Sequence, residues 1–408
     1  MRISTANSFD SAIGNLQRRQ QDLSESQMQL TTGKRINVAS DDPVAAARAE
    51  RAMSSIARSE ANQRGLEASR NTMGLSEAAL GDAVELLQQA RETLIAAGNG
   101  SYSDGERRSL AIRLREVRNQ MLSVANRPDG GGGFVFGGQG SSSPPFVDMP
   151  GGVQFVGQGG EAQASSSEKL SLTVDGDLVW LKAKTGNGVF ETQVATTNTG
   201  EAWISAGSIS APGSLPYPAP TGTTPPVYTI QFATGPGGTT YDILEDGNAL
   251  ASGVPYEKGK SITIPGRGMD VGISGNPANG DSFSIQQSTN TLSVFDTLDR
   301  AINALNATNM NNGQVQQTVN TGLAGVDSLL SNIQSARSAV GETLNRMDGI
   351  ENRISSLKLT AENDRSSAED LDMVEAISKF QSKQTGYDAA LKSYAMVQKL
   401  SLFQYVNI

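Results

Sequence analysis

Residues 373–406 read MVEAISKFQSKQTGYDAALKSYAMVQKLSLFQYV, and their apolar side chains recur at alternating intervals of four and three. This heptad spacing is typical of a helix that packs against another helix. The spacing predicts a seam made of Ile377, Phe380, Tyr387, Leu391, Tyr394, Leu402 and Tyr405, interrupted by Gln384 and Gln398. Ser366 and Glu369 have the spacing of a capping box, so we expect this helix to begin there and to run almost to Ile408.

The amino-terminal end carries the same pattern. Its seam consists of Phe9, Ile13, Leu16, Leu23 and Leu30, with Gln20 and Gln27 as polar interruptions. We expect the two ends of the chain to pair as a coiled coil and to bury their outer faces against other subunits. The alternative is the ordinary core of one globular bundle. Burying a Leu-sized side chain contributes about 1.5–3 kcal/mol, and two helices alone would leave the face beyond Leu400 in water, which favours the assembly surface.

Composition excludes several classes of function. The chain has 408 residues and a formal net charge of −9, which disfavours nucleic acid or an anionic membrane as the main partner. It contains no Cys and no His, which removes disulfides, Cys-ligated zinc, thiol nucleophiles and the commonest general base. We therefore expect neither an enzyme nor a cofactor or metal site.

The sequence also lacks targeting segments of the common kinds. No run approaches the roughly 20 apolar residues that span a bilayer, so we expect no membrane insertion. The first residues lack the apolar core of a secretory signal. The chain is therefore expected either to stay in the cytoplasm or to be exported by a route without such a signal.

Two boundary signals follow the first helix. Gly33 is a candidate C-cap, and Asp42 before Pro43 is a candidate N-cap followed by the residue best tolerated at the first helical position. A helix from Pro43 to Ala97 would be about 80 Å long, whereas a compact globule of this chain length is about 56 Å across. We expect an elongated molecule unless Gly65, Gly74 or Gly81 interrupts the helix. Ser103 and Glu106 predict a capping box that opens the next helix.

The stretch between the first two helices resembles a known family. Thr31-Thr32-Gly33-Lys34-Arg35-Ile36-Asn37, followed by Ser40-Asp41-Asp42-Pro43-Val44-Ala45-Ala46-Ala47, is similar to the amino-terminal motif of the flagellin superfamily. The form with Pro43 after the paired Asp resembles the hook–filament junction members of that superfamily, since flagellin itself usually carries Ala and Gly there. The segments 134–146, 274–283 and 400–405 also resemble the family.

A β region is inserted between the helical arms. Alternation at Leu170, Leu172 and Val174, then at Val179 and Leu181, predicts a hairpin around Asp175-Gly176. Further strands are predicted at 228–232, 243–244, 262–264 and 283–285, and an exposed Pro-rich loop at 212–226.

Residues 253–261 mimic a phosphate-binding loop. Their glycines are separated by five residues where the motif needs four, and a strand follows where a helix should begin. We therefore interpret this stretch as a hairpin loop.

The second helical arm keeps the alternation of four and three from Val319 to Lys358. The predicted fold is α+β and elongated, with long helical bundle and coiled-coil arms from both termini and an inserted mainly-β domain. We expect a terminal coiled-coil domain at 1–40 plus 365–408, a helical rod domain at 41–145 plus 288–364, and a β domain at 146–287.

The resemblance implies an extracellular structural subunit of the bacterial flagellum, exported through the flagellar secretion channel without a cleaved signal peptide. Its implied partners are other copies of itself in a ring, the first hook–filament junction protein, flagellin and an export chaperone. Two alternatives remain open: a flagellin subunit of the filament, and a cytoplasmic helical-rod scaffold or an adhesin with a β head.

Overall fold

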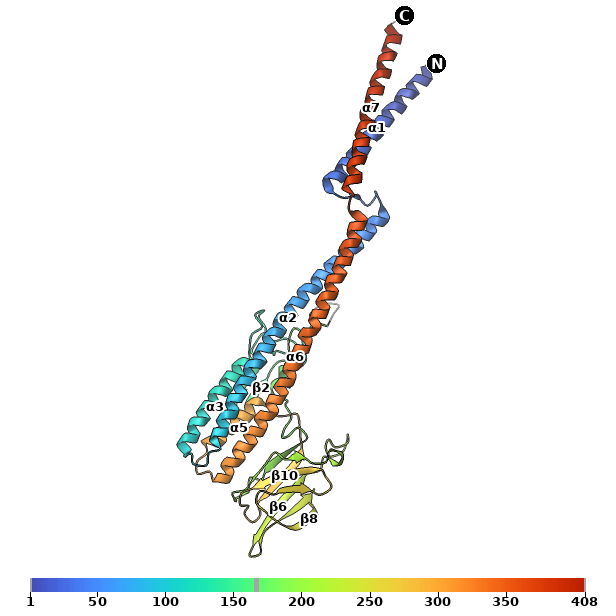
Figure 1. The fold of residues 1–408 in the computed structure, drawn as a ribbon. Helices are drawn as coiled ribbons and strands as arrows, with labels where there is room; N and C mark the ends of the chain where they lie inside the picture. Colours follow the sequence, from blue (N-terminus) through green and yellow to red (C-terminus); the bar gives the residue numbers. More distant parts are fainter. Residues whose placement is uncertain (1, 165–168, 407–408) are drawn as a thin grey trace. The chain divides into compact units, whose positions relative to one another are not determined.

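A computed structural model describes residues 2–164 and 169–406, with side chains described between residues 9 and 398. The chain divides into two compact units. One comprises Met1–Arg64 with Ile350–Ile408, and the other comprises Gly65–Gly349. The predicted helical arms and inserted β region are confirmed (Figure 1).

The first unit is helical. It contains α1 (Arg2–Thr32), the beginning of α2 (Pro43–Ala97), the end of α6 (Asn312–Glu369) and α7 (Met373–Val406). Helix α1 packs against α7 (Figure 1). The α2 and α6 segments meet through small side chains, with an ion pair of 3.1 Å between Lys358 Nζ and Glu60 Oε1. The buried side chains of these segments are Ala45, Ala49, Ala52, Ser59, Ile350, Ile354, Ala361, Ala368 and Glu369.

The predicted start of the last helix near Ser366 is wrong. Helix α6 continues to Glu369, and α7 begins only at Met373. The Asp372 carboxylate caps α7 by accepting hydrogen bonds from the amides of Val374 (3.0 Å) and Glu375 (3.1 Å). The Glu369 carboxylate forms ion pairs with Lys34 at 3.2 Å and with Arg365 at 3.5 Å. It therefore holds the loop after α1 and does not take part in a capping box.

The second unit contains the rest of α2 and α6 together with α3 (Asp104–Ala125) and α5 (Val294–Asn306). No glycine interrupts α2. Apolar side chains are buried along α2 at Leu66, Met73, Leu80, Leu87 and Leu94. The predicted alternation of α6 is buried at Val319, Val326, Leu330, Ile333, Val340 and Met347. The capping box of Ser103 and Glu106 is confirmed, and the hydrogen bonds from Ser103 lower the pKa of the Glu106 carboxyl.

An aromatic core lies between α5 and the irregular segment that follows α3. This segment contains β1 (Phe146–Met149), β2 (Gly152–Phe155) and α4 (Gly176–Trp180). The rings of Phe136 and Trp180 meet edge to face at 5.2 Å, and Phe146 and Phe295 complete the cluster. The predicted hairpin around Asp175-Gly176 is wrong, because the Asp175 side chain accepts from the Asp177 amide and caps α4, whose Trp180 is fully buried.

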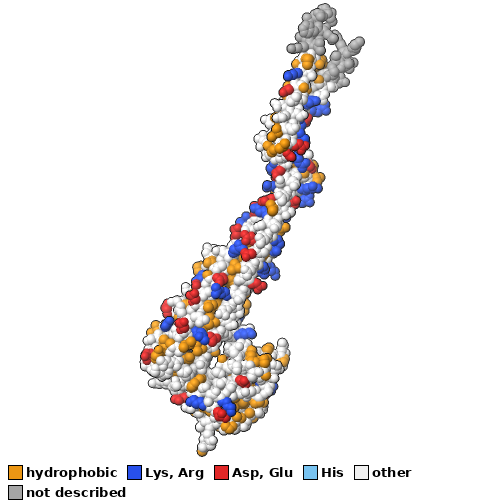
Figure 2. Space-filling model, viewed as in Figure 1, with side chains coloured by type: hydrophobic (Ala, Val, Ile, Leu, Met, Phe, Trp, Pro, Cys, Tyr) orange, Lys and Arg blue, Asp and Glu red, His pale blue; other side chains and the backbone are white. Residues whose placement is uncertain are grey.

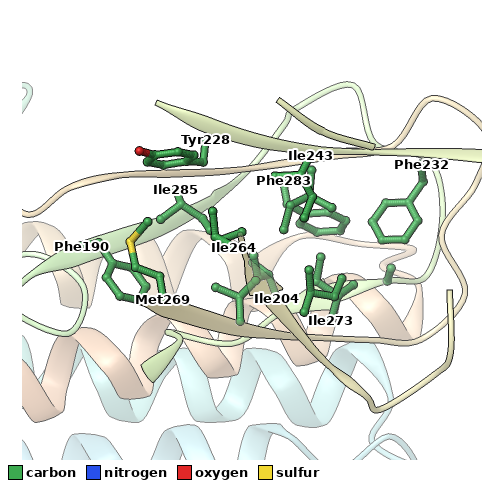
Figure 3. Close-up of a cluster of buried hydrophobic side chains, with 14 of the residues drawn as sticks. Phe190, Ile204, Tyr228, Phe232, Ile243, Ile264, Met269, Ile273, Phe283 and Ile285 are labelled. Atoms are coloured by element: carbon green, nitrogen blue, oxygen red, sulfur yellow. The ribbon is translucent and has the colours of Figure 1, made fainter. Parts of the chain in front are cut away.

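The β domain is a pair of packed sheets. One sheet has the order β3-β11-β6-β7-β8, and in the other β10 pairs with β4 and β5 on one side and β9 on the other, all antiparallel. Inward side chains from both sheets, including Phe190, Phe232, Met269 and Phe283, form one buried core (Figure 3). The strand bounds are β3 Phe190–Val194, β4 Trp203–Ile204, β5 Ser208–Ile209, β6 Tyr228–Gly235, β7 Gly238–Glu245, β8 Asn248–Pro255, β9 Ser261–Ile264, β10 Met269–Ser274 and β11 Ser282–Gln287.

Two loop predictions need correction. The mimic of a phosphate-binding loop spans the end of β8 and the turn into β9, which belong to different sheets, so it is a crossover and not a hairpin loop. The Pro-rich loop contains a short 3₁₀ turn (Pro212–Ser214) and is not wholly exposed. Its Tyr217 is only 4% exposed and donates a hydrogen bond to the Pro226 carbonyl.

Candidate assembly surface

The motif between α1 and α2 closes against the break between α6 and α7. Gly33 ends α1 with φ +68°, a conformation that glycine adopts without steric cost. The Gly33 carbonyl accepts from the Leu371 amide at 3.0 Å, and Lys34 forms an isolated bridge with Asp370. The two helical arms are therefore interrupted at the same level and joined there by backbone hydrogen bonds.

Arg35 and Ile36 fasten this loop to the end of α6. The Arg35 amide donates to the Glu369 carbonyl at 2.7 Å, and its guanidinium donates to the Ala368 carbonyl at 2.9 Å. A Gln29 amide group donates back to the Arg35 carbonyl at 2.9 Å. Ile36 is 9% exposed and supplies the loop's buried apolar side chain.

The remaining motif residues shape the entry into α2. The Asp41 carboxylate accepts from the amides of Asn37 and Val38, both at 3.0 Å, which fixes a tight turn. The Asp42 carboxylate accepts from the amides of Val44 (3.2 Å) and Ala45 (3.0 Å), which is N-capping of α2. Pro43 occupies the first helical position, where its missing amide proton costs nothing. Each of these motif residues thus has a backbone role in the loop.

Helices α1 and α7 make a thin seam. The Phe9 and Tyr394 rings meet edge to face with centroids 6.4 Å apart, and Lys383 Nζ donates to Ser26 Oγ at 2.8 Å. Of the predicted seam residues with described side chains, seven are half-buried: Phe9, Leu16, Leu23, Leu30, Phe380, Tyr387 and Tyr394. Three are exposed, namely Ile13 at 40%, Ile377 at 46% and Leu391 at 41%. The side chains of Leu402 and Tyr405 lie outside the described residues.

Two small residues and one lysine in this seam were not predicted. Ser26 and Ala376 are the most buried side chains of α1 and α7 among those described, and Lys383 reaches Ser26 across the seam. A search for apolar residues at heptad spacing passes over such positions. The polar interruptions Gln20, Gln27, Gln384 and Gln398 are exposed in the chain itself.

Other apolar side chains of these helices face solvent. Val374 is 82% exposed, Met396 60%, Val397 52% and Met28 51%. Figure 2 shows hydrophobic side chains lying in small patches among charged ones on the visible face of the helices. These exposed apolar side chains are available for contact with other subunits.

Metal and membrane sites were also sought. Among the described residues, no group of His, Cys, Asp or Glu is arranged to hold a metal ion. No described helix is long and apolar enough to cross a membrane.

Comparison with known proteins agrees with this geometry. The family profile of the bacterial flagellin N-terminal helical region matches residues 3–141, and that of the C-terminal helical region matches residues 323–406. Flagellar hook-associated protein 3 of Salmonella typhimurium is 31% identical over 182 residues, which are 43% of this chain and 54% of that protein. The chain thus spans about half the length of this curated relative.

Solved structures extend the likeness to most of the chain. The crystal structure of flagellar hook-associated protein 3 from Legionella pneumophila is 30% identical, with a TM-score of 0.69, and the match covers 77% of this chain and 97% of that one. That of FlgL from Xanthomonas campestris is 28% identical, with a TM-score of 0.67 and a cover of 78% and 99%. With both flagellin helical regions in its arms, and a loop that joins those arms through the residues of the family motif, the chain belongs to the flagellar hook-associated protein 3 family of the flagellin superfamily.

Proposed function

We propose that this protein is a structural subunit of the bacterial flagellum at the hook–filament junction, where it adapts the first junction protein to the flagellin filament. The single observation that carries this proposal is the match that spans 97% of the solved hook-associated protein 3. The role needs no chemistry from the chain, only surfaces that bind other subunits.

The terminal seam is the surface on which we place assembly. Its predicted apolar side chains with described positions are half-buried or exposed when α1 has only α7 as a neighbour, so much apolar area is left to bury. Each further Leu-sized side chain buried contributes about 1.5–3 kcal/mol. We propose that this area is covered by three partners: neighbouring copies in a ring, the first junction protein on one side, and flagellin on the other.

Export fits the same proposal. A subunit built into a structure outside the cell has to be exported, and the relatives of this chain are flagellar proteins. We propose export through the flagellar secretion channel, with a chaperone that covers the apolar seam until assembly.

The competing role is that of a filament subunit. A flagellin would carry the same helical arms, but the Asp42-Pro43 form and the hook-associated relatives favour the junction. A cytoplasmic scaffold or an adhesin would need no flagellar partners, so the flagellar relatives favour neither of these roles.

Deletion of the gene tests the proposal in its native organism. We expect cells that build hooks but carry no filaments and export flagellin into the medium, and filaments should return when the gene is supplied again. Electron microscopy of isolated hooks and immunoblotting of the medium measure both results. Filaments of normal length in the deletion strain would refute the proposal, and loss of hooks would place the protein earlier in assembly.

A further inference from the structure

A groove runs between α2 and α6 within the helical unit formed by residues 1–64 and 350–408. Its volume is about 660 Å³, and its floor is made of the small side chains Ala45, Ala52, Ala361 and Ala368. Two exposed apolar side chains, Val44 (63%) and Leu357 (56%), stand at its rim. A floor of alanines lets another apolar segment approach the helix backbones closely.

The α2 rim of this groove is basic. Arg48 and Arg51 both line it and are both exposed. Arg51 Nε donates to the carbonyl of Ala47 in its own helix, and no ion pair joins Arg48 or Arg51 to a carboxylate in the described part of the chain. Arg35 and two carboxylates, Asp42 and Asp364, also line the groove, and Arg35 pairs with Asp42 at 3.8 Å. The groove therefore offers apolar contact beside a lining with one more cation than it has carboxylates.

The chain also carries a segment of the opposite character. We name residues 370–377, which span the break after α6 and the beginning of α7, the acidic knob. It holds three exposed carboxylates beside three exposed apolar side chains. Of the carboxylates, Asp370 forms no ion pair with another described residue, Asp372 also caps α7, and Glu375 also pairs with Lys379 at 2.7 Å on the surface. The apolar side chains are Met373 at 45%, Val374 at 82% and Ile377 at 46%.

These two surfaces do not meet within one molecule. Val374 is among the most exposed apolar side chains, and no knob residue lines the groove. Because each chain carries both surfaces, the contact of a knob with the groove of another copy is heterologous, and repeated head-to-tail contact closes into a ring when its rotation allows.

We propose that the acidic knob of one copy docks in the groove of the next, with Val374 on the alanine floor and the knob carboxylates beside Arg48 and Arg51. This contact deepens the proposed junction role by naming the lateral contact between copies, and it rests on that role only for its place in the flagellum. The occupant is a second copy because the charges and apolar side chains of its knob complement the groove. Opposite charges at the rim also make association weaken as salt rises.

Cysteine cross-linking tests the contact directly, since the chain has no cysteine of its own. One preparation carries Ser55→Cys in the groove and a second carries Val374→Cys in the knob. A disulfide requires Cα atoms within about 7 Å, so mixing the two preparations at high concentration under mild oxidation should give the mixed disulfide dimer. The matched control is Ser54→Cys, which lies outside the groove on the same turn and should give about ten-fold less dimer.

Charge exchange supplies the second measurement. Arg48→Glu with Arg51→Glu should reduce the number of filaments restored to the deletion strain about ten-fold or more, because like charges then face each other. Adding Asp370→Arg and Glu375→Lys to the same chain should recover filaments. Arg58→Glu with Arg64→Glu, two exposed arginines of the same helix outside the groove, should restore filaments as the unchanged gene does.

The outcomes separate this inference from the proposed function. The docking is overturned, while the junction role stands, if two results are found together. Filaments are restored by Arg48→Glu with Arg51→Glu even without the knob substitutions, and the Ser55–Val374 disulfide does not exceed the Ser54 control. Loss of filaments in the groove variant without recovery by the knob reversal and without the disulfide would mean that another flagellar protein occupies the groove, which also overturns it. If deletion of the gene leaves filaments intact, the disulfide between purified copies still decides the docking.

Discussion

At the scale of single residues, the residues of the family motif stabilise the backbone of the loop between α1 and α2. Gly33 supplies a positive φ, Asp41 and Asp42 accept backbone amides, and Arg35 reaches a carbonyl of α6. None of these roles is catalytic, and none depends on a side chain that must be presented to a partner. The motif therefore fixes where both helical arms break, which in turn sets where α1 and α7 begin their seam.

Removing the cap of α2 should loosen this loop. Asp42→Ala deletes the carboxylate that accepts the Val44 and Ala45 amides, at a cost of about 1 kcal/mol. We expect hydrogen exchange of those two amides to rise about five-fold, because a cost of that size changes a local opening equilibrium by this factor. Asp42→Asn keeps a capping oxygen and should exchange nearly as the unchanged protein does. Equal exchange in Asp42→Ala would show that the cap does not hold the loop.

Arg118 is a buried cation outside the motif that pairs with two carboxylates. Its guanidinium donates to Asp148 Oδ1 at 2.8 Å and to Asp299 Oδ2 at 3.1 Å, beside the Phe295 ring. The hydrogen bond from Arg118 lowers the pKa of the Asp148 carboxyl. Because the pKa in the folded state is lowered, this contact stabilises the fold above the ordinary aspartate pKa, and the stabilisation is lost as pH falls through the lowered value.

We therefore expect Arg118→Ala to reduce the free energy of unfolding by about 2 kcal/mol at pH 7, since it leaves two half-exposed carboxylates beside an aromatic core. Urea denaturation followed by the near-ultraviolet signal of the aromatic cluster measures this loss. The difference between variant and unchanged protein should shrink at pH 3. A difference that grows on acidification would contradict the assignment.

At the scale of elements, sequence patterns succeed where their cause is local. Ser103 with Glu106, Gly33, and Asp42 before Pro43 were all predicted, because a cap depends on residues within one turn. Ser366 and Glu369 have the same Ser-x-x-Glu spacing as Ser103 and Glu106 but form no capping box. Glu369 instead pairs with Lys34, which is 335 residues away in sequence. Asp175 caps a short helix where a hairpin was expected, because aspartate favours turns and N-caps alike.

The α1–α7 pair should be the least stable element among those described. Its seam is half-buried, whereas Lys34 and Arg35 are tied to Glu369 and to the Ala368 carbonyl. Brief trypsin treatment of the purified protein should cut after Arg18 or Arg19 first, and about ten-fold more slowly at Lys34-Arg35, because cleavage requires local unfolding. Mass spectrometry of the early fragments gives the order. Cleavage at both pairs at the same rate would mean that the loop opens together with the helix.

The seam and the β domain should be separable by mutation. Leu391→Ala with Tyr394→Ala removes one exposed and one half-buried side chain of α7, far in sequence from the packed sheets. We expect this double variant to fail to restore filaments in the deletion strain while thermal unfolding of the β domain stays unchanged. Lys392→Ala, on the same helix, is the control and should restore filaments. Normal assembly of the double variant would remove the α7 seam from the proposed assembly surface.

At the scale of the whole molecule, the sequence predicts two helical arms around a β insertion because helical periodicity and β alternation are read from near neighbours. The pairs β7–β8 and β9–β10 are hairpins of neighbouring strands, but their placement in separate sheets was not predicted. That placement depends on partners distant in sequence, such as β6 for β11 and β4 for β10. The same limit applies to assembly. A heptad seam shows that a helix needs a partner, but it does not show which partner. The division of the chain into a terminal domain, a rod domain and a β domain at the predicted bounds stays a prediction.

The last prediction separates a junction from a filament. A filament subunit adds to copies of itself without end, whereas a junction subunit stops after one layer, because its outer surface fits flagellin better than it fits another copy, by a few kcal/mol. We expect purified protein, seeded with hook fragments that carry the first junction protein, to add a short cap and then halt however much protein is supplied. Flagellin added next should elongate from that cap, and hooks without the cap should elongate poorly. Electron microscopy of cap length against protein concentration measures the halt. Long filaments of this protein alone would make it a flagellin, because the surface that faces outward would then accept its own kind.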